Sequence, residues 1–225
     1  GIQLMPKVTV DGGMKQSLVS WALAASMFVM ASSAQAQLST GASGFSSAPT
    51  EASEKEYWWL VRELGRCLAQ NKTDQSIDFL AASSGSPQED RAFGKLFNRT
   101  RNMCMRNFVR ASFVRAHVRG TVAEGLFNRN LSQHADDYVP VVSAPDKIVS
   151  IHDFATCYVA SNYVQARTFL SETRLATEGE LEYVQRLAPS FKPCLPVGRE
   201  VELIAMDIRL ALAEALYRAT SMSVA

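Results

Sequence analysis

Apolar side chains recur at intervals of three and four residues from residue 53 onward, which is the spacing of amphipathic helices. Helix start signals divide this pattern into segments: Ser53 with Glu56 matches a capping box, and Ser86 is followed by a proline. Only residues 138–142 look extended, and the proline among them argues against a central strand. The pattern predicts an all-α fold, with helices near 54–70, 74–83, 87–105, 109–130, 146–160, 162–173, 178–189 and 199–219.

The second half of the pattern nearly repeats the first at an offset of 90 residues, without a gap. The helix starts recur as well, although Thr177 stands one residue out of register with Ser86. We therefore expect a tandem duplication of a four-helix unit, packed as a pseudo-twofold helical bundle. Matched positions include Gln75 and Gln165, Phe79 and Phe169, Leu80 and Leu170, Phe93 and Tyr183, Arg119 and Arg209, Ala123 and Ala213, Glu124 and Glu214, Leu126 and Leu216, and Phe127 and Tyr217.

The last helix of each unit is the most apolar, and in the second unit apolar side chains cover most of its circumference. A helix with this pattern is buried on several sides. The two final helices are therefore expected at the centre of the molecule. In the second unit the apolar residues are Leu203, Ile204, Met206, Ile208, Leu210, Leu212, Leu216 and Tyr217.

The segment before the helices resembles a signal peptide. Met14 and Lys15 open a positive segment, an apolar run follows over 18–31, and Ala34-Gln35-Ala36 forms a small-x-small cleavage site. The run is shorter than the roughly 20 residues that span a bilayer, so cleavage after Ala36 is favoured over an uncleaved anchor. The predicted organisation is 1–13 as a non-native or misassigned start outside the fold, 14–36 as signal peptide, 37–52 as flexible tether, 53–131 as repeat 1, 132–145 as linker and 146–225 as repeat 2.

Four cysteines form two equally spaced pairs, Cys67 with Cys104 and Cys157 with Cys194, each 37 residues apart. In the oxidising periplasm or outside the cell, such pairs are normally disulfides. Closure within each repeat is favoured, and each bond is expected to add about 4 kcal/mol of stability in the chain-entropy model. No CxxC spacing occurs, which argues against zinc or redox chemistry.

The most informative polar pattern is Arg-x-x-x-Ala-Glu, because the chain contains it twice. Arg119 and Glu124, like Arg209 and Glu214, stand too far apart around one helix to pair well. Pairing across the two final helices fits better, so we predict structural ion pairs between Arg119 and Glu214 and between Arg209 and Glu124. The alternative is a paired-carboxylate site, with the two glutamates as acid and base of an envelope hydrolase.

A run of basic residues in repeat 1 contains no acidic residue between Asp90 and Glu124, although the net charge of the chain is only +1. The run could attach the protein to an anionic lipid or glycan surface. It could also face the acidic residues of repeat 2, or be ordinary solvated surface. Nucleic acid fits less well, and any membrane contact would be peripheral. The candidate binding residues are Arg91, Lys95, Arg99, Arg106 and Arg110.

No nucleophile, phosphate-loop or dinucleotide signature is present, so catalytic residues, cofactors and metals are not predicted. His134 and His152 flank the linker beside aspartates, but solvent exposure explains them better than a metal site. Among Tyr57, Trp58 and Trp59, one ring should anchor the core while another is exposed and available to a partner. These observations favour an exported binding or scaffolding module, with an envelope protein as one candidate partner.

Overall fold

The computed structural model describes residues 53–98, 102–105, 112–131, 139–196 and 201–221, together with the backbone of residues 8–9. Within these ranges it contains seven α-helices, which confirms the all-α class. No helix in the described part of the chain is long and apolar enough to cross a membrane. The helices are α1 (Glu54–Asn71), α2 (Thr73–Ala81), α3 (Pro87–Leu96), α4 (Arg115–Leu131), α5 (Ile151–Glu172), α6 (Glu178–Leu187) and α7 (Ala205–Ser221).

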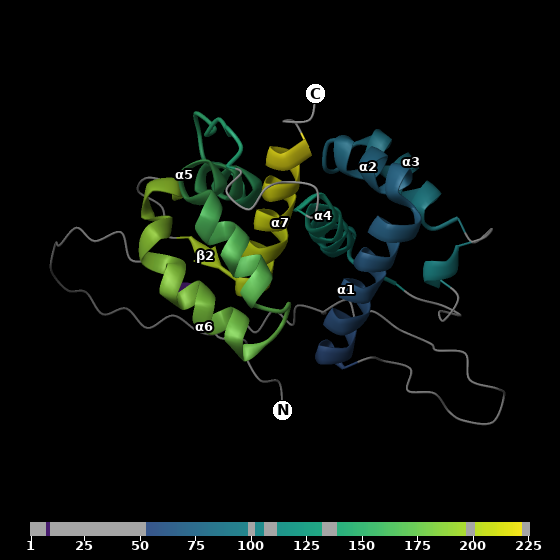
Figure 1. Ribbon diagram of the computed structural model, residues 1–225, viewed down its shortest axis with the longest axis horizontal. Helices are drawn as coiled ribbons and strands as arrows, with labels where there is room; N and C mark the ends of the chain where they lie inside the picture. The colour runs from purple at the N-terminus through teal and green to yellow at the C-terminus, as the bar shows by residue number, and fades with distance from the viewer. Residues whose placement is uncertain are drawn as a thin grey trace, which may run out of the picture.

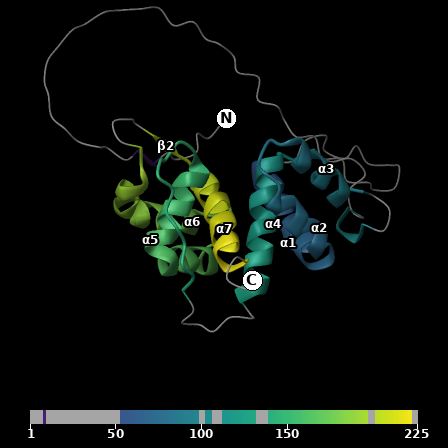
Figure 2. The same ribbon diagram turned by 90° about the horizontal axis from the view of Figure 1, so that it is seen from above.

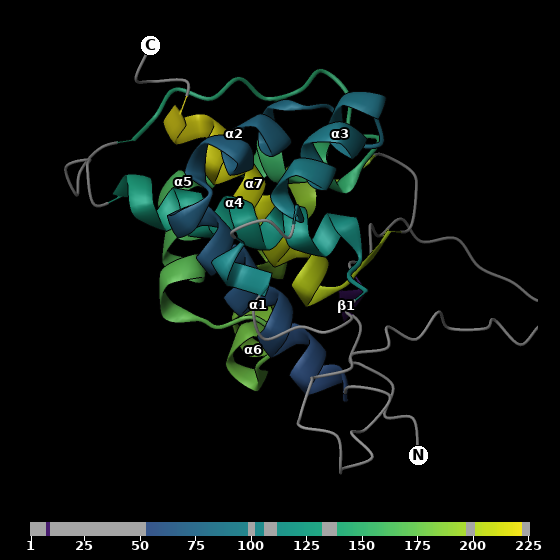
Figure 3. The ribbon, with the colours of Figure 1, turned by 90° about the vertical axis from the view of Figure 1, so that its right-hand side faces the viewer.

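Helices α4 and α7 lie side by side at the centre of the molecule, between two groups of outer helices (Figure 1). Helices α1, α2 and α3 lie on the α4 side, and α5 and α6 lie on the α7 side, as the view from above also shows (Figure 2). Figure 3 views the α1–α3 group from its outer side, with α1 against α4. Every residue of α7 from Ile208 to Tyr217 is buried, as expected for a central helix.

Side-chain caps set where the outer helices begin. The hydroxyls of Ser53, Ser86 and Thr177 accept hydrogen bonds from the backbone of α1, α3 and α6, so the predicted starts of these helices are confirmed. Helix α5 begins later than the predicted residue 146, because Ser150 and Asp153 form a capping box there.

The break expected between 160 and 162 is present as a kink within α5. Asn162 has φ −139° and ψ 41°, outside helical values. Lys72, which separates α1 from α2, has almost the same conformation, with φ −134° and ψ 47°. In the first half α1 and α2 precede α3, and in the second half the two segments of the kinked α5 precede α6 in the same way.

Three further predicted helix bounds were wrong. The helix expected over 109–130 begins at Arg115, and the described residues 112–114 before it are not helical. The helix expected over 87–105 ends at Leu96, whose carbonyl accepts a hydrogen bond from Nδ2 of Asn102. The side-chain oxygen of Asn102 accepts the Cys104 N–H, and the short 3-10 helix η1 (Met103–Met105) begins there. The helix expected from 199 begins at Ala205, after the two-residue strand β2 (Glu202–Leu203). Strand β2 pairs antiparallel with β1 (Val8–Thr9), in a region that was not expected to take part in the fold.

Both predicted disulfides are present. Cys67 of α1 bonds to Cys104 of η1, and Cys157 of α5 bonds to Cys194 of the 3-10 helix η2 (Ala188–Cys194), with a Cα–Cα distance of 5.6 Å in each. Each bond ties the first helix of its half to the segment that follows the third helix. No described cysteine is free.

The two central helices approach closely at Gly120 of α4. A Cβ atom built there would lie 2.5 Å from Cβ of Leu210 in α7, which is closer than real carbon contacts. We therefore expect Gly120→Ala to lower the free energy of unfolding by about 1–3 kcal/mol in urea titrations. Gly94→Ala is the matched control, since nothing lies within 4 Å of a Cβ on this α3 glycine. Equal effects of the two substitutions would contradict the close crossing.

Candidate functional site

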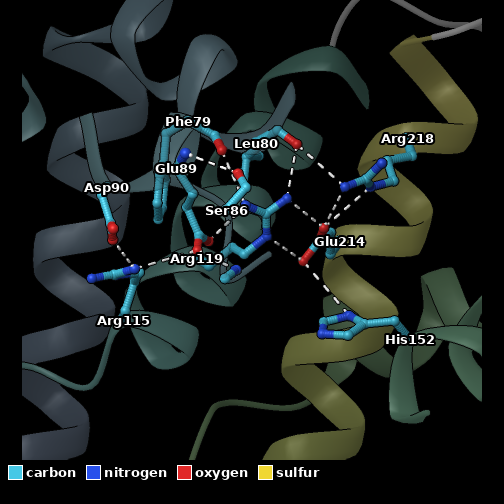
Figure 4. Close-up of polar contacts among 11 residues, drawn as sticks. Phe79, Leu80, Ser86, Glu89, Asp90, Arg115, Arg119, His152, Glu214 and Arg218 are labelled. Carbon is cyan, nitrogen blue, oxygen red and sulfur yellow. Dashed lines mark hydrogen bonds and ion pairs between the residues drawn. The ribbon is translucent and has the colours of Figure 1, made fainter. Parts of the chain in front are cut away.

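Arg119 of α4 is a buried side chain, at 1% exposure, whose guanidinium donates five hydrogen bonds. Its Nε and one terminal nitrogen donate to the two carboxylate oxygens of Glu214 in α7, at 3.0 and 2.9 Å (Figure 4). The guanidinium also donates to Oε1 of Glu89 at 2.9 Å and to the carbonyls of Phe79 and Leu80. A buried charge is stable only with such complete pairing.

Arg209 of α7 makes the corresponding contacts in the other half. It is also 1% exposed, and it donates to both carboxylate oxygens of Glu124 in α4, at 3.0 and 2.7 Å. Its remaining donors reach the hydroxyl of Thr173 at 2.7 Å and the carbonyls of Thr173 and Leu170. The structure thus brings together Arg119 with Glu214 and Arg209 with Glu124, across the central helix pair.

Two further buried carboxylates, Glu89 and Glu180, belong to this network and were missed as functional residues. Each stands three residues after the N-cap of its helix and is 1% exposed. Oε2 of Glu89 accepts the N–H of Gly85 at 2.8 Å, and Oε2 of Glu180 accepts the N–H of Ala176 at 2.7 Å. The donors Gly85 and Ala176 both have positive φ, 75° and 59°. The capping pattern was visible in the sequence, but capping glutamates are usually at the surface, so nothing indicated burial.

The environments of these carboxylates differ. Burial alone would raise the pKa of Glu214, but the hydrogen bonds and charges of Arg119 and Arg218 outweigh it and hold the pKa below its ordinary value. Burial raises the pKa of Glu180 to about 7, against the opposing effects of Arg209 and the Ala176 N–H. Glu214 therefore stays ionised at neutral pH, and an ionised carboxylate cannot act as a general acid.

A polar cleft of about 310 Å³ opens beside Glu214. Nδ1 of His152 lies 3.8 Å from the Glu214 carboxylate, and Arg218 donates to the same carboxylate at 2.8 Å. Both halves of the chain contribute to the walls, since two serines come from the α2–α3 connection and the other residues from α5 and α7. The lining residues are Ser83, Ser84, His152, Asp153, Thr156, Ala211, Glu214, Ala215 and Arg218.

The chain matches no family model, no curated protein and no solved structure. What the cleft can bind is therefore inferred from its lining residues. They include hydroxyl groups, carboxylates and an arginine, and such groups suit recognition of a polar ligand.

The candidate basic surface is only partly described. Arg91 and Lys95 are exposed on α3, whereas Arg99, Arg106 and Arg110 lie outside the described residues. Two other arginines of the same run are paired with carboxylates. Arg119 is buried as above, and Arg115 forms ion pairs with Asp90 and, at 3.6 Å, with Glu89.

The remaining candidates fall in different places. His134 lies outside the described residues, and His152 lines the cleft. No group of three or more His, Cys, Asp or Glu side chains suited to a metal ion occurs where the structure is described. Trp58 is buried and Trp59 is 55% exposed. The buried ring packs against His117, which the sequence did not single out, at 4.5 Å between ring centres.

Proposed function

We propose that the chain is exported after cleavage of a signal peptide following Ala36, and that its helical part is a binding or scaffolding module in the periplasm or outside the cell. The two disulfides support this, because such bonds persist in oxidising compartments. The partner that we propose is a protein of the cell envelope, which would contact the cleft beside Glu214.

We further propose that the helical part arose by tandem duplication and packs about a pseudo-twofold axis. Contacts that recur in both halves support this proposal. The two disulfides have the same sequence separation, 37 residues. The guanidinium carbon of Arg119 lies 5.5 Å from the Phe79 ring centre, and that of Arg209 lies 5.5 Å from the Phe169 ring centre.

The observation that carries a binding function is the contrast between the interior charges and the cleft. Arg119 and Arg209 donate to both oxygens of the two central glutamates, so these carboxylates are engaged in ion pairs within the protein. The cleft, in contrast, presents polar side chains to solvent, such as His152, whose side chain is 48% exposed. This contrast argues against the envelope hydrolase with Glu124 and Glu214 as its catalytic pair.

Site-specific photo-crosslinking in the exporting host tests this function. Benzoylphenylalanine at Ser84, on the rim of the cleft, should give one discrete protein adduct. The same group at Val164, which is 61% exposed and does not line the cleft, should not give it. His152→Ala should reduce the Ser84 adduct severalfold. Identical adducts from both positions, or no adduct from Ser84, would contradict a binding cleft.

Attachment to an anionic lipid or glycan surface through repeat 1 is a narrower proposal. Among its residues only Arg91 and Lys95 have described positions, and both are exposed. Attachment of this kind predicts retention on anionic vesicles that falls as salt is raised. Retention that does not change with salt would contradict it.

A further inference from the structure

An apolar groove of about 310 Å³ lies beside strand β2, next to the start of α5. It shares no lining residue with the cleft beside Glu214. Eight of its ten described lining residues are apolar, and one of the two polar ones, Ser150, is engaged in the capping box of α5. Phe154 and Leu203 are buried there, whereas the other apolar residues keep exposed surface and so suit contact with an apolar ligand. These are Ile148, Val149, Ile151, Leu195, Pro196 and Val201.

Strand β2 forms one wall of this groove, and its edge is occupied by a distant segment of the chain. Both residues of β2, Glu202 and Leu203, line the groove. In the antiparallel pair, Leu203 stands opposite Val8 and Glu202 opposite Thr9 of β1. Figure 2 shows β2 at the periphery of the helices of the second half. The edge of β2 therefore accepts an extended strand from elsewhere in sequence.

The first half of the chain covers the corresponding backbone with one of its own side chains. Phe113 stands 90 positions before Leu203. Its ring centre lies 6.3 Å from that of Tyr57, in the first turn of α1. The Tyr57 hydroxyl also accepts the N–H of Val114 at 3.2 Å. Helix α1 thus provides a hydrogen-bond partner for the backbone just before α4.

The second half has no helical counterpart of this turn. Helix α5 begins at Ile151, and the position 90 residues earlier, Val61, lies well inside α1. The position that corresponds to Tyr57 is Lys147, in a stretch before α5 that is not helical. The partner of the backbone before α7 is instead β1, which precedes the proposed cleavage site.

We propose that, in the exported protein, the edge of β2 and the adjoining groove bind an extended apolar segment of a partner protein in place of β1. The inference rests on the proposed function, because cleavage after Ala36 removes β1 and leaves the edge of β2 unpaired. Backbone hydrogen bonds along the edge would hold such a segment, and alternate apolar side chains would lie in the groove. A segment rich in β-branched residues, as at Val8 and Thr9, fits this role.

Titration of the full chain with a fluorescein-labelled peptide of residues 6–10, followed by fluorescence polarisation, tests the site. A variant with Val8→Pro and Thr9→Pro opens the edge, because proline does not fit a paired strand. It should bind the peptide roughly tenfold or more tightly than the unmodified chain, in which the tethered β1 competes at high effective concentration. Ser39→Pro with Thr40→Pro, outside β1, is the matched control and should bind as weakly as the unmodified chain.

Substitutions in the groove and in the peptide show where the peptide binds. In the opened variant, Val149→Lys should weaken binding severalfold, because it places a charge in the apolar groove. Val149 is 84% exposed, so the fold should tolerate the change. Val164→Lys, at a position that is 61% exposed and outside the groove, should leave affinity unchanged. A peptide that carries Val8→Pro and Thr9→Pro should not bind.

Equal binding by the opened variant and the unmodified chain, or equal weakening by Val149→Lys and Val164→Lys, would overturn the proposal. Dimerisation of the opened variant in sedimentation runs without peptide would assign the edge to a second copy and overturn the partner. The Ser84 photo-crosslinking result does not decide this site, which shares no residue with the cleft. If the opened variant binds the peptide but the exported protein retains residues 8–9, the export proposal is wrong and the acceptor edge stands.

Discussion

Arg119→Met should lower the free energy of unfolding by about 3–5 kcal/mol, the usual cost of removing one partner from a buried ion pair. The substitution keeps most of the side-chain volume but removes the donors to Glu214 and Glu89, both of which are buried. Urea unfolding at pH 7, followed by circular dichroism, measures the loss. Arg66→Met is the control, since that arginine pairs with Glu63 at the surface and should cost less than about 1 kcal/mol.

A double-mutant cycle tests whether the pair acts as a unit. Glu214→Gln alone should also destabilise the protein, because it leaves Arg119 without its main counter-charge. Combined with Arg119→Met, it should add little to the larger single loss, since each substitution removes the same interaction. Additive losses from Arg119 and Glu214 would show that the two side chains contribute independently, and the cross-helix network would then be wrong.

Removal of either disulfide is expected to have an effect of similar size. The double variant Cys157→Ala and Cys194→Ala should lose about 4 kcal/mol, the chain-entropy value for a loop of this length. The variant that lacks Cys67 and Cys104 should lose nearly the same, because both pairs are separated by 37 residues.

The same urea titrations measure this loss, with the unmodified protein kept oxidised and then fully reduced as a reference. Full reduction should destabilise the protein at least as much as either double variant. A loss below about 1 kcal/mol for one pair would show that its loop is already constrained without the bond.

Local signals explain why most of the fold could be predicted. Ser53, Ser86 and Thr177 cap helices through interactions within one turn, so their effect is visible in a short stretch of sequence. The end of α3 could not be predicted, because it depends on the side chain of Asn102, which bonds to a carbonyl six residues earlier. The pairing of β1 with β2 joins segments almost the full chain apart, and no local pattern specifies it.

The candidate site was predictable only where the chain repeats a pattern. Arg119 and Glu124 stood out because the same pattern recurs in the second half as Arg209 and Glu214. The burial of Glu89 and Glu180 depends on how α3 and α6 pack, which the capping signature does not encode.

The measurement that tests the central claim most directly is non-reducing intact and peptide mass spectrometry of the protein exported by its native host. An N-terminus at Gln37 together with Cys67–Cys104 and Cys157–Cys194 peptides is the result that an exported, disulfide-stabilised binding module predicts. Retention of residues 14–36 with four free thiols would contradict export, and the function would then have to be sought inside the cell.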